Sequence, residues 1–273
     1  MFRLSMGFAC LVFLASCANT PQVTPAARSD LAPTGKLRVG INYGNLLFAT
    51  RDRATGEASG IAIDLARELG RRMGMPVELV GYDSGGQLTA GLKAGGWDLA
   101  FLAYEQAREA EITFAGAFAE TDSTYLVPAG SKLRIAEDVD REGVRVAVSA
   151  KGGNDLFLTR TLKRAQLVRV PGSAAAFKMF VADNLDAFAA LRPELMRRAA
   201  NLPGSRVLDG RFSVIQYSVG TPKGRDAGAE YLRRFVEDVK ASGLVAQMID
   251  RSGVRGLTVP LPPPTVQIGG GSM

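Results

Sequence analysis

The stretch that decides the fold is residues 95–118, GGWDLAFLAYEQAREAEITFAGAF. Its apolar run, residues 98–103, predicts a buried strand, and the polar segment that follows carries Arg108. In an open α/β sheet, ligands bind just beyond the carboxyl ends of the strands. A guanidinium at that place presents a planar fork of donors to a carboxylate or phosphate. The alternative interpretation is a surface charge that pairs with Glu105 or Glu111, three residues away on either side.

The segments around this stretch repeat one order of elements twice. The first half predicts strand, helix, strand, helix and strand over residues 37–41, 61–73, 77–81, 88–94 and 98–103. The second half predicts the same order over residues 144–148, 155–164, 167–170, 174–181 and 186–190. Alternating strands and helices are typical of parallel sheets. The sequence therefore predicts an α/β fold of two lobes, each a mostly parallel sheet flanked by helices.

Two extended segments are predicted to join the lobes. Residues 121–128 lead out of the first lobe, and residues 211–219 lead back to a final helix over residues 227–241. Two crossovers between two lobes are typical of a hinge. The predicted boundaries are residues 36–124 for lobe one, 125–213 for lobe two and 214–258 for the return to lobe one.

The two ends of the chain predict segments outside the folded body. Arg3 and the short apolar run 8–14 predict a signal peptide over residues 1–16, too short to span a bilayer. The order Leu-Ala-Ser-Cys that ends at Cys17 resembles a bacterial lipoprotein cleavage site. We therefore expect a lipidated Cys17, a flexible tether over residues 17–35 and anchoring to a bacterial membrane in the periplasm. The proline-rich residues 259–273 predict a disordered tail.

Composition excludes several kinds of function. The chain has no histidine, so histidine-based triads, general bases and metal ligands are excluded. Its formal charge of +6 comes from scattered arginines, without a basic tract interleaved with aromatic residues. We therefore predict no nucleic-acid partner, no metal and no cofactor.

Six segments carry a resemblance to a known family. They are KLRVGINYG (36–44), SGIAIDLARELGRRMG (59–74), the opening stretch 95–118, GVRVAVSAKGG (143–153), LDAFAALRP (185–193) and SGLVAQMI (242–249). In this order they resemble the periplasmic solute-binding proteins of family 3, the amino-acid-binding components of bacterial ABC importers. The resemblance implies a cleft between two lobes, a monomer, a small-molecule solute and an ABC permease in the inner membrane as partner.

The resemblance also implies which residues contact the solute. The family anchors the solute's α-carboxylate with an arginine after the third strand, a position that Arg108 occupies six residues before Phe114. Glu105 stands where the family usually has a threonine. An anion-facing turn of lobe two corresponds to residues 151–154, in which Lys151, Gly152, Gly153 and Asn154 replace the usual Gly-Thr-Thr pattern.

The resemblance also implies aromatic contacts to the solute, and an acidic contact that this sequence lacks. Tyr43 and Phe48 occupy positions where the family places aromatic side chains over the ligand. The family binds the solute's ammonium with an aspartate after the last strand of lobe two, and here that residue is Leu191. Leucine cannot pair an ammonium. We therefore expect an anionic, carboxylate-bearing solute and weak binding of ordinary α-amino acids.

Two alternatives remain open from the sequence. The chain is either a binding protein or one that keeps the fold for ligand sensing or partner binding. The fold resemblance also includes dehydratases, which need a positioned acid or base. Glu105 and then Lys151 are the candidates for such a group, and we expect no enzyme activity.

Overall fold

The structure is a computed structural model that describes residues 22–260. The predicted signal peptide, the lipidation site Cys17 and residues 261–273 of the predicted tail lie outside the described residues. Within residues 22–260, no helix is long and apolar enough to cross a membrane.

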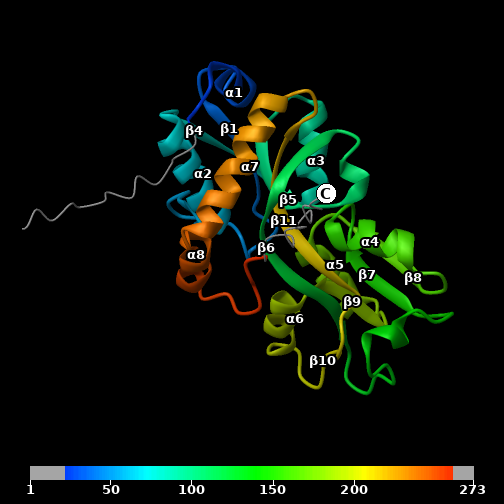
Figure 1. The fold of residues 1–273 in the computed structure, drawn as a ribbon. Coiled ribbons are helices and arrows are strands. Elements are labelled where there is room, and N and C mark those ends of the chain that lie inside the picture. The colour runs from blue at the N-terminus through cyan, green and yellow to red at the C-terminus, as the bar shows by residue number, and fades with distance from the viewer. Residues whose placement is uncertain (1–21, 261–273) are drawn as a thin grey trace, which may run out of the picture.

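One nine-stranded mixed sheet runs through both lobes in the order β4-β1-β5-β11-β6-β9-β7-β8, with β10 on β6 (Figure 1). Its strands are β1 (Leu37–Asn42), β4 (Val77–Tyr82), β5 (Leu99–Ala103), β6 (Ile112–Val127), β7 (Arg145–Ser149), β8 (Gln166–Val170), β9 (Ala187–Leu191), β10 (Arg206–Val207) and β11 (Ser213–Pro222). The strands β4, β1 and β5 are parallel, as are β8, β7 and β9. A short hairpin of β2 (Thr50–Arg51) and β3 (Ala58–Ser59) lies apart from this sheet.

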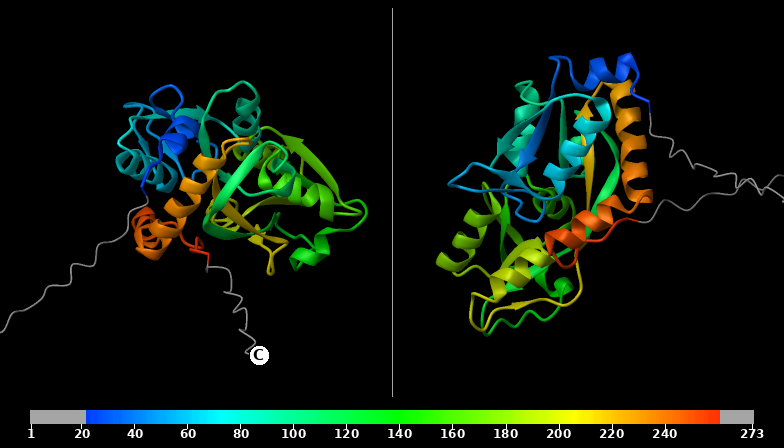
Figure 2. Two further views of the ribbon diagram at one scale, coloured as in Figure 1. Left: turned by 45° about the horizontal axis from the view of Figure 1, so that its top comes forward. Right: turned by 90° about the vertical axis from the view of Figure 1, so that its left-hand side faces the viewer.

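Helices flank each half of the sheet. They are α1 (Pro25–Leu31), α2 (Ile61–Met73), α3 (Gly85–Lys93), α4 (Gly153–Thr161), α5 (Ser173–Ala182), α6 (Arg192–Ala199), α7 (Asp226–Ala241) and α8 (Leu244–Ser252). In the right-hand view of Figure 2, the blue, cyan and orange elements form lobe one, above the green and yellow elements of lobe two. The two-lobed α/β fold predicted from the sequence is confirmed.

The connection between the lobes is a pair of long antiparallel strands. The strand β6 pairs with β11 from Ile112 to Ser123 and with β9 from Ser123 to Leu126. One strand therefore belongs to both lobes, and its neighbour β11 brings the chain back. Most of each extended segment predicted from the sequence, residues 121–128 and 211–219, lies in this pair, although β6 begins earlier than predicted and β11 begins and ends later.

A buried acid fixes the return of the chain to lobe one. Asp98, fully buried, receives two hydrogen bonds of 2.8 Å from Arg38 and one of 2.9 Å from Arg225. Arg38 lies on β1, and Arg225 directly precedes α7. Asp98 thereby ties the start of β5 to its neighbouring strand and to the returning segment.

The predicted flexible tether is wrong from Pro25 onward. Residues 25–31 form α1, which begins with the Thr24 side chain accepting a hydrogen bond from the Ala27 backbone. Leu31 is fully buried, and the Asp30 carboxylate accepts a 2.9 Å hydrogen bond from the Gly228 backbone on α7. A threonine cap followed by proline is a helix-start signal. Burial of the leucine side chain stabilises the packing of this helix against lobe one.

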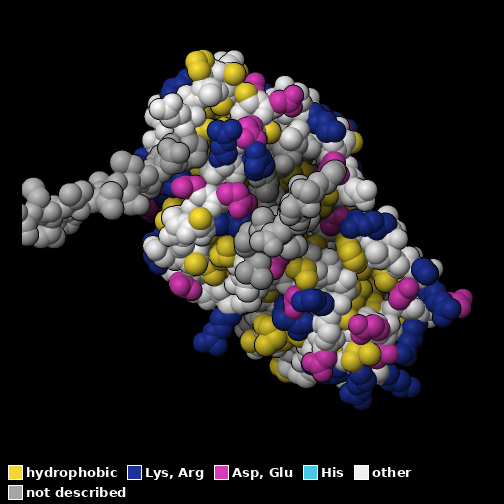
Figure 3. All heavy atoms as spheres, in the orientation of Figure 1, with side chains coloured by type: hydrophobic (Ala, Val, Ile, Leu, Met, Phe, Trp, Pro, Cys, Tyr) yellow, Lys and Arg dark blue, Asp and Glu magenta, His cyan; other side chains and the backbone are white. Residues whose placement is uncertain are grey.

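The surface mixes charges of both signs. On the face in Figure 3, lysine and arginine side chains are interspersed with aspartate and glutamate side chains. Neighbouring arginines often share one acid, as Arg233 and Arg234 share Glu230 on α7. Arg233 and Arg234 therefore lie on a solvated helix face.

Candidate solute-binding cavity

A cavity of about 100 Å³ lies between the lobes and is lined by residues of both. Lobe one and the joining strands contribute Phe48, Arg108, Phe118 and Tyr217. Lobe two contributes the starts of α4, α5 and α6 and the end of β9. The cavity thus sits beyond the carboxyl ends of parallel strands, as expected for an open α/β sheet.

Arg108 is the buried cation of this cavity. It ends a short 3₁₀ turn, Gln106–Arg108, and only 5% of the residue is exposed. Its guanidinium donates to the Ala103 carbonyl at 2.6 Å and to the Lys151 carbonyl at 3.1 Å. Its buried Nε has no hydrogen-bond partner among the described residues. A guanidinium has five N–H donors, so three remain for a ligand.

No carboxylate in the described part of the chain forms a salt bridge with Arg108. Glu105 pairs with Arg160 and Glu111 with Lys93, so the interpretation of Arg108 as a paired surface charge is wrong. Burial lowers the pKa of Arg108, partly opposed by the Glu105 carboxylate, yet arginine stays protonated in proteins. A buried charge without a counterion is costly. The cavity therefore favours an anion at Arg108.

Helix starts add to this preference for an anion. The side chain of Ser84 caps α3, and Gly152 precedes α4, whose first residues Gly153 and Asn154 also line the cavity. Ser173 begins α5 at the same cavity. The first N–H groups of a helix lack intrahelical acceptors and carry partial positive charge. These helix starts therefore reinforce the positive potential around the Arg108 guanidinium.

An aromatic wall closes the lobe-one side. Phe48 stacks on Tyr217 with ring centroids 4.0 Å apart and meets Phe118 edge-on at 5.8 Å. Asn45 donates a 2.9 Å hydrogen bond to the Tyr217 hydroxyl and so fixes that ring. Burial raises the pKa of Tyr217, which therefore stays neutral at ordinary pH. This wall provides an apolar surface for the body of a ligand.

The cavity holds one acid that sequence reasoning missed. Glu194 lies in the first turn of α6 and lines the cavity, with 13% of its side chain exposed. Its carboxylate accepts hydrogen bonds of 2.8 and 2.9 Å from the Ser173 hydroxyl and lies 3.3 Å from Arg198. Glu194 follows Leu191 by three residues, about one helical turn, and that spacing was the available signal.

Six of the nine residues singled out in the sequence line this cavity. They are Phe48, Arg108, Gly152, Gly153, Asn154 and Leu191. The other three, Tyr43, Glu105 and Lys151, do not line it. Their side chains have other partners or face away.

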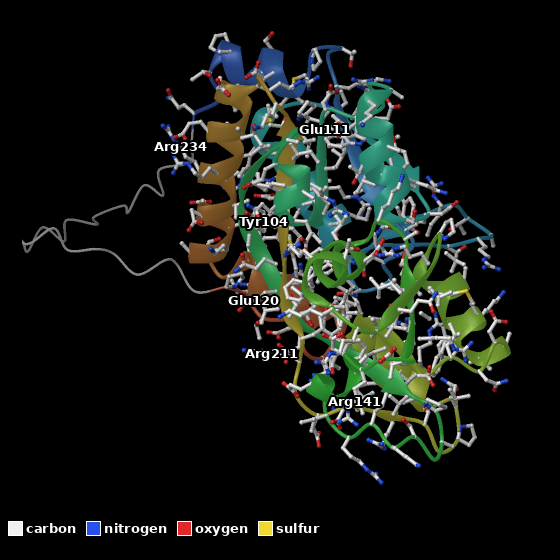
Figure 4. The ribbon with its side chains drawn as sticks, turned by 90° about the vertical axis from the view of Figure 1, so that its right-hand side faces the viewer. Tyr104, Glu111, Glu120, Arg141, Arg211 and Arg234 are labelled. Atoms are coloured by element: carbon white, nitrogen blue, oxygen red, sulfur yellow. The ribbon has the colours of Figure 1, made fainter. Side chains whose placement is uncertain are left out.

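Glu105 belongs to a second cleft. It is buried and pairs with Arg160 of α4 at 2.5 Å, which makes an ion pair between the lobes. The second cleft is also lined by Tyr104, Glu120 and Arg211, which Figure 4 labels near the joining strands. The expectation that Glu105 contacts the solute of the main cavity is therefore not supported by its position.

Tyr43 and Lys151 lie outside the cavity for local reasons. The Tyr43 ring packs over the Arg51 guanidinium at 4.9 Å and against Gly81. Lys151 is exposed and adopts a left-handed backbone with φ of 56°. Its carbonyl reaches Arg108 while its side chain does not line the cavity. The lysine therefore contributes a backbone acceptor in place of the predicted charge.

The two lobes are in contact in this structure. The hydrogen bond from the Arg108 guanidinium to the Lys151 carbonyl and the Glu105–Arg160 pair both cross between lobes. A methyl group added at Gly86 of α3 would lie 3.0 Å from the Lys151 Cβ and 3.1 Å from the Ala150 carbonyl. This arrangement is a closed one that a bulkier residue at position 86 would oppose.

Replacing Gly86 with alanine is therefore expected to weaken ligand binding without weakening the fold. Alanine favours a helix over glycine by about 1 kcal/mol, so the melting temperature of the free protein should not fall. Overpacking at the lobe contact should oppose closure by about 1 kcal/mol or more, roughly a fivefold loss of affinity. Calorimetric titration measures the affinity, with Ala90→Ser at an exposed position of α3 as control. Unchanged affinity in Gly86→Ala would contradict the closed arrangement.

The family model described as bacterial extracellular solute-binding proteins, family 3, matches residues 37–253. Among curated proteins, the glutamine-binding protein of Geobacillus stearothermophilus is 27% identical over 195 residues. That alignment covers 69% of this chain and 73% of the relative. The residues matched by the family model span both lobes and the joining strands.

Solved structures show the same fold. A mutant of ArgBP from T. maritima superposes with a TM-score of 0.71 at 21% identity, covering 83% of this chain and 99% of that one. An ancestral amino acid-binding protein, a precursor of cyclohexadienyl dehydratase, superposes with a TM-score of 0.69 at 21% identity. The superposition covers 82% of this chain and 97% of that one. A protein described as a binding component of an ABC transporter from Wolinella succinogenes DSM 1740, complexed with lysine, superposes with a TM-score of 0.69 at 23% identity. The superposition covers 80% of this chain and 95% of that one.

Proposed function

Because the chain belongs to family 3 of the bacterial extracellular solute-binding proteins, we propose that it captures a small carboxylate-bearing solute between its lobes. Family membership supports a role outside the cytoplasm as the binding component of an amino-acid ABC transporter, the role by which one structural neighbour is described. In this proposal the closed, loaded protein presents both lobes to an ABC permease. A monomer suffices for that role.

The observation that carries this proposal is the state of Arg108. It is a buried guanidinium at the cavity with three donors free and without a carboxylate partner in the described residues. A ligand carboxylate would supply both the missing counterion and the missing acceptors. The N–H groups at the start of α4 would approach the same ligand from lobe two.

The positions of the Arg108 guanidinium and the start of α4 on opposite lobes suggest how the two lobes close over the ligand. The solute's carboxylate would first bind Arg108 on lobe one. Bending of β6 and β11 would then bring the turn around Gly152 over the ligand. The hydrogen bond from Arg108 to the Lys151 carbonyl and the Glu105–Arg160 pair would form in the same movement. The ligand thus stabilises the closed form by contacts that the open form lacks.

Membrane anchoring is a further part of the proposal. The Leu-Ala-Ser-Cys order at Cys17 supports lipidation after cleavage of residues 1–16. The segment between Cys17 and α1 would then be the tether, shorter than the sequence indicated because α1 docks on lobe one. The lipid would hold the protein beside its permease.

Binding is favoured over chemistry in this cavity. One structural neighbour is a precursor of cyclohexadienyl dehydratase, so the dehydratase alternative has a relative on the same fold. The two groups that the sequence named for acid–base catalysis, Glu105 and Lys151, do not line the cavity. Ligand sensing without transport would use the same binding event and differs only in the partner.

A thermal-shift panel of amino acids, monocarboxylates, dicarboxylates and phosphonates tests the proposal. At least one carboxylate is expected to raise the melting temperature, since a ligand at 100 times its Kd stabilises by about 2.7 kcal/mol. The sequence predicts an anion without an ammonium, on the basis of Leu191. An unchanged mass of the bound compound after incubation would separate a binder from an enzyme. A panel without any carboxylate hit would overturn the proposal.

A further inference from the structure

We propose that Glu194 accepts the ammonium of the solute, so that the cavity selects a small neutral amino acid. This inference rests on the proposed capture of a carboxylate at Arg108 and adds the second charge of the ligand. It replaces the expectation, drawn from Leu191, that the site has no acid to receive an ammonium.

The position of Glu194 supports this role. The last strand of lobe two, β9, ends at Leu191 against the cavity, and the chain continues directly into α6. Glu194 therefore projects from the first helical turn, where the helix dipole stabilises a carboxylate. The Ser173 hydroxyl bridges both carboxylate oxygens and orients the group, and Arg198 of the same helix donates to one of them at 3.3 Å. Two carboxylate oxygens offer about four acceptor sites, so about one site remains for an ammonium beside these partners.

The charges around the cavity define the ligand's own charges. Arg108 and Glu194 are the two ionisable Asp, Glu, Lys or Arg residues among those that line it within the described chain. Tyr217 lines the same cavity as these two residues. Burial raises the pKa of its hydroxyl, and the charges of Arg108 and Glu194 act on that pKa in opposite directions. One cation from lobe one and one anion from lobe two match a ligand with one carboxylate and one ammonium. A second charge on the ligand would have no lining partner of opposite sign.

The size and surface of the cavity restrict the rest of the ligand. A cavity of about 150 Å³ accommodates benzene, which has six non-hydrogen atoms. The present cavity of about 100 Å³ is smaller, so in the closed form it suits a ligand of at most about that size. Phe48, Phe118 and Leu191 provide apolar surface for a short side chain. Alanine, with its single methyl group, fits these limits, and the long cationic side chains of arginine and lysine exceed them.

The test compares L-alanine with isobutyrate, in which a methyl group replaces the ammonium. Calorimetric titration of the full chain is expected to show much tighter binding of L-alanine. In Glu194→Gln, which keeps the shape and a hydrogen-bond acceptor for Ser173, L-alanine should lose on the order of 10- to 100-fold in affinity. Isobutyrate should bind that variant as well as, or better than, it binds the natural chain. Glu142→Gln, at an exposed position of lobe two, should behave as the natural chain does.

Each outcome separates this inference from the proposed function. If isobutyrate or a dicarboxylate binds the natural chain as tightly as L-alanine, Glu194 does not receive an ammonium, while carboxylate capture stands. If Glu194→Gln lowers the affinity for both compounds equally, the residue only supports the cavity, and the inference is wrong. If neither compound nor any other carboxylate binds, the proposed function itself fails. L-arginine and L-lysine are expected to bind weakly, and tight binding of either would contradict the size argument.

Discussion

Arg108→Met is expected to lower the affinity for the carboxylate solute by on the order of 100-fold or more. Breaking a buried ion pair by removing one partner costs about 3–5 kcal/mol, and each 1.4 kcal/mol is tenfold in affinity. In the complex, the ligand carboxylate would be that buried partner, because Arg108 pairs with no acid of the described chain. Methionine has a similar reach, so the cavity should keep its shape. Calorimetric titration with the best ligand of the panel measures the change.

Two controls make this result specific. Arg108→Lys keeps the charge but loses the planar fork, so it should fall between the natural chain and Arg108→Met. Arg233→Met removes an exposed arginine on α7 and should leave the affinity unchanged. Circular dichroism should show folded protein for all three variants. Full affinity in Arg108→Met would show that the carboxylate binds elsewhere.

Asp98→Asn is expected to lower the melting temperature by about 6–12 °C. The fully buried Asp98 carboxylate joins Arg38 of β1 to Arg225 before α7, and breaking such a buried pair costs about 3 kcal/mol or more. For a chain of this size, each kcal/mol shifts the melting temperature by roughly 2–4 °C. The start of β5 and the returning segment should loosen together. Thermal unfolding followed by circular dichroism gives the shift.

The same carboxylate predicts a dependence on pH. Burial raises the pKa of Asp98, but the hydrogen bonds and charges of Arg38 and Arg225 outweigh it, so the pKa is lowered in the folded state. Stability from this group is therefore present above its unfolded pKa of about 3.9 and is lost as the pH falls through the folded pKa. Asp98→Asn should lose less stability than the natural chain over that acid range. Asp250→Asn, at an exposed position, serves as control, and an equal effect of both variants on stability would contradict the role of Asp98.

Most of the fold could be predicted from local sequence patterns. The apolar spacing of Ile61, Leu65, Leu69 and Met73 predicts α2 with the bounds that the structure shows. Strand and helix order in both lobes also follows the predicted order. These elements are predictable because each buries one apolar face, and the spacing of the apolar residues shows which face that is.

The partners of the charged residues could not be predicted from the sequence. Glu105 lies three residues from Arg108, yet it pairs with Arg160 from the other lobe. Glu194 reaches the cavity because β9 ends against it and α6 starts there with a fixed rotation. Both outcomes depend on how two lobes meet in space, which local spacing does not encode. The position of Arg108 was predictable because it follows directly from the end of β5.

A crystal structure with the best-binding solute tests the central claim most directly. We expect the ligand between the lobes, with carboxylate oxygens about 2.7–2.9 Å from guanidinium nitrogens of Arg108. The N–H groups at the start of α4 should contact the same ligand. A solute bound with its carboxylate away from Arg108, or in the second cleft beside Arg160, would contradict it.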